Sequence, residues 1–162
     1  GAGNINQIGK IIEQCVQILQ KVKNVNVVIG ESIIGKQVEI SGSRVQILRD
    51  YPNSLYFNGF DFAIIAGGYN SYHEAIYHAL PSICIPNTNT GMDDQLARAN
   101  VASRNKSMLV LDEPVMADLE ESIAKMLDPE FRSQLKAKCA EDSQSNGAED
   151  SAKFILKMID ES

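Results

Sequence analysis

A short apolar run that ends in two glycines constrains this chain more than any other feature. Residues 61–65 are typical of a buried strand, Gly67 and Gly68 follow, and residues 71–79 are typical of a helix. A strand that passes through glycines into a helix exposes backbone N–H groups at the positive end of the helix dipole. Such a junction binds anions, most often phosphate. The plainer interpretation is a tight turn with close packing.

The rest of the chain alternates strands with helices in the same way. Strands are predicted at 24–29, 44–48, 61–66, 82–85 and 108–111, and helices at 5–22, 52–58, 71–79, 92–105, 115–127, 129–143 and 147–160. This alternation predicts an α/β fold, a Rossmann-like parallel sheet with helices on both faces. Ligands of such sheets bind outside the carboxyl ends of the strands, so a site is expected in the turns there.

Composition excludes several classes of function. A length of 162 residues suits one domain, and a net charge of −6 without a basic run argues against a nucleic-acid partner. No apolar run approaches the roughly 20 residues that span a bilayer. The cysteines are few, odd in number and widely spaced, at Cys15, Cys84 and Cys139. They favour a reduced, cytoplasmic setting over disulfides or a zinc site.

The first residues are typical of a loop that follows a strand. Residues 1–4 have this character, yet no strand precedes them. In a doubly wound sheet the first helix normally follows a strand. We therefore expect residues 1–162 to form a single domain that is a fragment lacking its first strand.

Three blocks of the sequence together resemble a known family. They are Gly67-Gly68 with Ser71 and Glu74, then residues 79–86, then residues 93–95 followed by Arg98-Ala99. In order and spacing they resemble the nucleotide-sugar-binding, C-terminal half of GT-B glycosyltransferases, in particular the MurG-like group of glycosyltransferase family 28. The resemblance implies one half of a GT-B fold, with an N-terminal acceptor domain missing from these residues.

The resemblance also assigns roles to residues. It implies that the Gly-rich turn and the helix after it hold the donor diphosphate, that a helix glutamate holds the ribose, and that two other loops hold the uracil and the donor sugar. The residues are Gly67, Gly68, Tyr69, Asn70 and Ser71 for the diphosphate, Glu74 for the ribose, Leu48, Arg49 and Asp50 for the uracil, and Asn89, Thr90, Gly91, Asp94 and Gln95 for the sugar. Asp94 stands where the family often has a second glutamine, and Arg98 stands where it commonly has asparagine.

The activity that the resemblance implies is transfer of a hexosyl or N-acetylhexosaminyl group from a UDP-sugar to an acceptor hydroxyl. Backbone amides and the helix dipole would stabilise the leaving diphosphate, so no metal and no cofactor is expected. No catalytic residue is assigned, because in this family the general base and the acceptor groove come from the other domain. The acceptor, a glycan or a lipid-linked sugar, stays open. The expected location is cytoplasmic, or peripheral at the inner membrane face through the missing half.

Alternatives remain for the whole chain and for single residues. A nucleotide-sugar 2-epimerase would need further acid–base carboxylates near the sugar. A non-catalytic nucleotide-binding subunit with a membrane partner and a receiver-type regulatory domain are the other two. Asp93 and Asp94 begin a predicted helix, where the dipole alone favours carboxylates. His73 and His78 are five residues apart, which is not a metal-ligand spacing on one helix face, and a surface or supporting role is expected for both.

Overall fold

The computed structural model describes residues 5–31, 40–88, 93–142 and 147–160. In chain order the elements are α1 (Ile5–Gln20), β1 (Val27–Gly30), β2 (Val45–Leu48), the 3-10 helix η1 (Asn53–Gly59), β3 (Ala63–Ile65), α2 (Tyr69–Tyr77), β4 (Ser82–Cys84), α3 (Gln95–Asn105), β5 (Leu109–Val110), α4 (Met116–Leu127), α5 (Pro129–Asp142) and α6 (Gly147–Asp160). Each predicted element is present, with ends shifted by up to three residues. The predicted loop at residues 1–4, and residues 92 and 143 at the ends of two predicted helices, lie outside the described residues.

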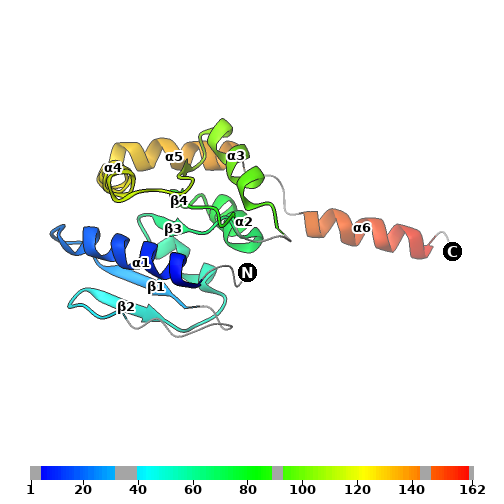
Figure 1. The fold of residues 1–162 in the computed structure, drawn as a ribbon. Coiled ribbons are helices and arrows are strands. Elements are labelled where there is room, and N and C mark those ends of the chain that lie inside the picture. The colour runs from blue at the N-terminus through cyan, green and yellow to red at the C-terminus, as the bar shows by residue number, and fades with distance from the viewer. Residues whose placement is uncertain (1–4, 32–39, 89–92, 143–146, 161–162) are drawn as a thin grey trace.

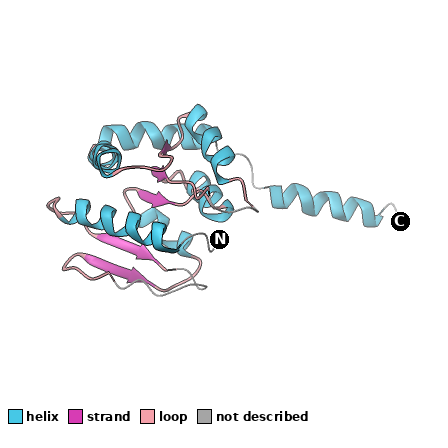
Figure 2. Cartoon of the chain, in the orientation of Figure 1, coloured by secondary structure: helices cyan, strands magenta, loops and turns pink. Residues whose placement is uncertain are grey.

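All strand pairs in the described part of the chain are parallel. β1 pairs with β2, with Val27 opposite Val45. The second sheet has the order β3-β4-β5, with Ile83 of β4 between its neighbours in the other two strands. Helices lie on both sides of the strands (Figure 2). This confirms the predicted α/β class.

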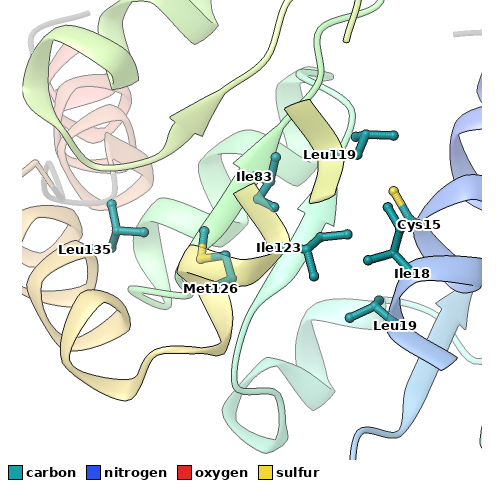
Figure 3. Close-up of a cluster of buried hydrophobic side chains, with 8 residues drawn as sticks. All are labelled: Cys15, Ile18, Leu19, Ile83, Leu119, Ile123, Met126 and Leu135. Carbon is teal, nitrogen blue, oxygen red and sulfur yellow. The ribbon is translucent and has the colours of Figure 1, made fainter. Parts of the chain in front are cut away.

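β4 lies at the centre of the molecule, and its side chains divide the core into two clusters. Successive strand residues point to opposite faces, so Ile83 and Cys84 contact different helices. The first cluster, drawn in Figure 3, contains Cys15, Ile18, Leu19, Ile83, Leu119, Ile123, Met126 and Leu135, from α1, β4, α4 and α5. The second contains Tyr72, Ala75, Ile76, Cys84, Ala99, Ala102, Met108 and Cys139, from α2, α3 and α5 around β4. The helices therefore cover both faces of the second sheet.

The cysteines belong to this core. Cys15, Cys84 and Cys139 are buried and free. Burial raises the pKa of each thiol to about 11. At neutral pH these thiols are therefore protonated, and they are poor nucleophiles.

α6 differs from the other helices. It extends away from the rest of the molecule (Figure 1). Its large apolar side chains are exposed, among them Phe154 and Ile159, each 64% accessible. Across the described ranges, no helix combines the length and the apolar character that crossing a membrane requires.

Candidate functional site

The glycine turn joins β3 to α2 as predicted, although α2 begins at Tyr69, two residues earlier than expected. Gly68 is the N-cap in an extended conformation, without a side-chain cap hydrogen bond. The first helical bond runs from the N–H of Tyr72 to the carbonyl oxygen of Gly68, at 3.0 Å. The N–H groups of Tyr69, Asn70 and Ser71 therefore precede the helical ladder at the positive end of the dipole. The turn has the geometry of an anion site.

The two glycines serve different purposes. A Cβ on Gly67 would lie 3.2 Å from the carbonyl oxygen of Gln95 and 3.3 Å from Sγ of Cys84, closer than ordinary contacts. A Cβ on Gly68 would meet no atom within 4 Å. Close packing therefore explains Gly67. It does not explain Gly68, which lies beside open space at the helix N-terminus.

Arg98 of α3 binds the carbonyl group of this turn, a contact that the sequence did not reveal. Its Nη1 donates a hydrogen bond to the carbonyl oxygen of Gly67. Its Nη2 forms an ion pair with Oδ1 of Asp93 at 2.5 Å, and its Cζ lies 5.5 Å from the ring centroid of Tyr69. Arg98 holds the pKa of the Asp93 carboxyl below its ordinary value, through the hydrogen bond first. In the sequence, the only signal was an arginine at a position where the family commonly has asparagine.

Aromatic rings extend this cluster along α2. The ring of His73 lies 4.4 Å from that of Tyr69 and 5.1 Å from that of Tyr72, centroid to centroid. Burial, and then the positive charge of Arg98, lower the pKa of His73. His78 lies further along and contacts the ring of Phe57 at 5.7 Å. His73 is thus a neighbour of the glycine turn, whereas His78 packs against η1.

Glu74 lies one turn into α2 and is half-buried. Its backbone carbonyl accepts the N–H of His78, as expected within a helix. Its place relative to the glycine turn is the one assumed in the sequence analysis. Its binding of ribose stays a prediction.

The residues predicted to bind the donor sugar have structural partners. Oδ1 of Asp94 accepts the N–H of Ala97 at 2.9 Å and so caps α3. Gln95 is only 5% exposed, and its Oε1 accepts the N–H of Asn87 at 2.9 Å. A sugar hydroxyl would have to share or replace these contacts. Asn89, Thr90 and Gly91 lie outside the described residues.

The residues predicted to bind uracil lie at the carboxyl end of β2, next to the end of β1. The carbonyl oxygen of Leu48 accepts the N–H of Glu31 at 3.0 Å, and Nε of Arg49 lies 2.7 Å from Oε2 of Glu31. The carboxylate of Asp50 accepts hydrogen bonds from the N–H of Tyr51 and the hydroxyl of Tyr56. Asp50 raises the pKa of Tyr56. Two charged pairs thus surround this backbone segment.

Metal-ligating side chains do not gather in the described part of the chain. There, no group of three or more His, Cys, Asp or Glu residues could hold a metal ion.

Comparison with known proteins gives a family match. The model of the glycosyltransferase family 28 C-terminal domain matches residues 1–155. No curated protein matches the chain.

Several solved structures share the fold. Acinetobacter baumannii MurG superposes with a TM-score of 0.73 at 14% identity, over 97% of this chain and 48% of that one. Spinosyn forosaminyltransferase SpnP gives 0.61 at 18% identity, over 84% of this chain and 35% of that one. Spinosyn rhamnosyltransferase SpnG, in complex with thymidine diphosphate, gives 0.63 at 19% identity, over 82% and 36%. The chain thus spans less than half the length of these proteins.

Proposed function

Because the chain belongs to the glycosyltransferase family 28 C-terminal domains, we propose that it binds a UDP-sugar whose hexosyl or N-acetylhexosaminyl group is transferred to an acceptor hydroxyl. The glycine turn carries this proposal. It offers N–H groups at the start of α2 beside a glycine with open space around its Cα. A diphosphate matches both the charge and the hydrogen-bonding capacity of that position.

The proposed pose follows the carboxyl ends of the strands. The diphosphate lies on residues 67–71, Glu74 accepts hydrogen bonds from the ribose hydroxyls, and the uracil pairs with backbone groups of residues 48–50. The donor sugar lies towards residues 89–91, Asp94 and Gln95. This order runs from the end of β2 past the end of β3 to the loop after β4.

The chemistry proposed for this domain is stabilisation of the leaving group. As the bond between the anomeric carbon and the diphosphate breaks, negative charge grows on the diphosphate oxygens. Preorganised N–H donors and the dipole of α2 stabilise that charge without reorganising. We assign the general base and the acceptor groove to an acceptor domain outside these residues, so this chain alone binds donor and transfers little sugar.

We also propose a cytoplasmic reaction, with any membrane contact made through the acceptor domain. The three cysteines favour this, since they are free and buried among the described residues. The acceptor is a glycan or a lipid-linked sugar, consistent with a role in cell-envelope polysaccharide.

Calorimetric titration tests the donor assignment. UDP, UDP-N-acetylglucosamine, thymidine diphosphate, GDP and ADP are compared on the wild type, on Glu74→Ala, and on Glu120→Ala as an exposed control on α4. We expect selective uridine binding, weakened about tenfold or more in Glu74→Ala, since hydrogen bonds to a charged group contribute about 1.5–3 kcal/mol. The loss should be much smaller with 2′-deoxy-UDP. A folded chain that binds none of these nucleotides would contradict the proposal.

A further inference from the structure

Arg98 links two segments that are far apart in the sequence. It belongs to α3, yet it donates to the carbonyl oxygen of Gly67, 31 residues away, while it pairs with Asp93 next to the start of its own helix. Its side chain is only 17% exposed. A partly buried guanidinium with two directed partners is held in one geometry, unlike an exposed surface pair.

The bond to Gly67 fixes more than one atom. The carbonyl of Gly67 and the N–H of Gly68 belong to one planar peptide unit, and this unit is trans. In a trans peptide the C=O and N–H bonds point in opposite directions. Arg98 therefore determines where the N–H of Gly68 points. That N–H has no acceptor among the described residues.

Glycine on both sides makes this peptide unusually easy to rotate. Residues without a Cβ reach backbone conformations that others do not, so the unit between Gly67 and Gly68 lacks the usual barrier to a flip. A flipped peptide would present a carbonyl oxygen in place of the N–H donor. An anion would then meet a negative dipole at the start of α2.

We propose that Arg98 is a positioning residue that locks the Gly67–Gly68 peptide with its N–H directed at the donor diphosphate. This rests on the proposed function, because it assumes that the diphosphate lies at the turn. The fork of the guanidinium holds the Gly67 carbonyl and the Asp93 carboxylate at once, which the single ammonium of lysine does not reproduce. The lock also ties the glycine turn to the loop that precedes α3.

The test compares nucleotides with and without the diphosphate. UDP and uridine are titrated by NMR into the wild type, Arg98→Met and Arg98→Lys, with Arg104→Met as a control on the exposed part of the same helix. We expect Arg98→Met to lose about tenfold or more in UDP affinity, which corresponds to about 1.4 kcal/mol. Uridine affinity should not change, and Arg98→Lys should fall between the two. The amide signal of Gly68 should shift with UDP in the wild type and not in Arg98→Met.

The possible failures are distinguishable. If the wild type binds UDP no more tightly than uridine, the proposed function fails whatever Arg98 does. If the wild type prefers UDP and Arg98→Met keeps that preference, or Arg98→Lys equals the wild type, only the lock is overturned. If Arg98→Met does not fold, Arg98→Lys and Asp93→Asn decide. Asp93→Asn keeps the arginine on Gly67 and should retain most of the preference for UDP.

Discussion

The two ends of the candidate site are built differently. At the glycine turn, a partly buried arginine joins α3 to the end of β3, and Gly67 packs against β4 and α3. At the end of β2, the contacts are between exposed groups, such as Arg49, which is 58% accessible. The diphosphate end is thus fixed by the core, whereas the base end lies on a thin edge.

The strands explain this difference. All three residues of β4 are buried, with helices on both faces and strands on both sides. In β2 only partly buried and exposed residues occur. A fixed turn suits a diphosphate, which is common to all nucleotide donors, and an adaptable edge suits the base, which differs between them.

The largest effect should come from truncating the same side chain in the two sheets. Ile83→Ala opens a cavity at a position of 0% exposure and should cost about 2–5 kcal/mol of unfolding free energy. Ile47→Ala in half-buried β2 should cost about 1–2 kcal/mol, because less apolar surface is lost and no closed cavity forms. Urea denaturation of both variants measures the comparison, and equal losses would show that the second sheet is no more rigid than the first.

Alanine at the two glycines should separate folding from binding. Gly67→Ala forces its Cβ against Gln95 and Cys84 and should cost about 1–3 kcal/mol through overpacking. Gly68→Ala should change stability by less than about 0.5 kcal/mol, since its φ of −61° suits alanine and its Cβ meets nothing. We expect Gly68→Ala nonetheless to weaken UDP binding, because the methyl group enters the proposed diphosphate site. A stable Gly68→Ala with unchanged UDP affinity would argue against that site.

The buried thiols give a pH dependence that belongs to the core alone. The folded chain holds protons on Cys15, Cys84 and Cys139 up to about pH 11, whereas unfolded thiols release them near the ordinary pKa of 9.0. The folded state therefore binds more protons between these values, and stability should fall as the pH rises from 9 to 11. At pH 8 the native thiols should react with iodoacetamide at least about 100-fold more slowly than after unfolding. Rapid labelling of any one of them in the native chain would contradict its burial.

Local patterns in the sequence predicted the elements well and the contacts of the site only in part. Apolar spacing predicted α1 and the strands, because period and burial are properties of neighbouring residues. The glycine turn was visible for the same reason. The bond from Arg98 to Gly67 spans 31 residues and depends on how α3 packs against β4, which no spacing reveals. Likewise, the sequence did not show that Gln95 is buried with its Oε1 on the N–H of Asn87.

The smallest effect is expected at the base end, and it should differ in kind from that of Arg98. Arg49→Met removes an ion pair with Glu31 whose arginine is exposed, so unfolding free energy should fall by at most about 1 kcal/mol, and less in 1 M salt. Lys125→Met, which breaks the exposed pair with Glu121 on α4, is the matched control.

In ligand binding, Arg49→Met acts on the base end, so UDP and uridine affinities should change by the same small factor. Arg98→Met should instead act on UDP alone. If Arg49→Met lowered UDP affinity and left uridine unaffected, the diphosphate would lie nearer β2 than the glycine turn, and the contrast between the two ends would be wrong.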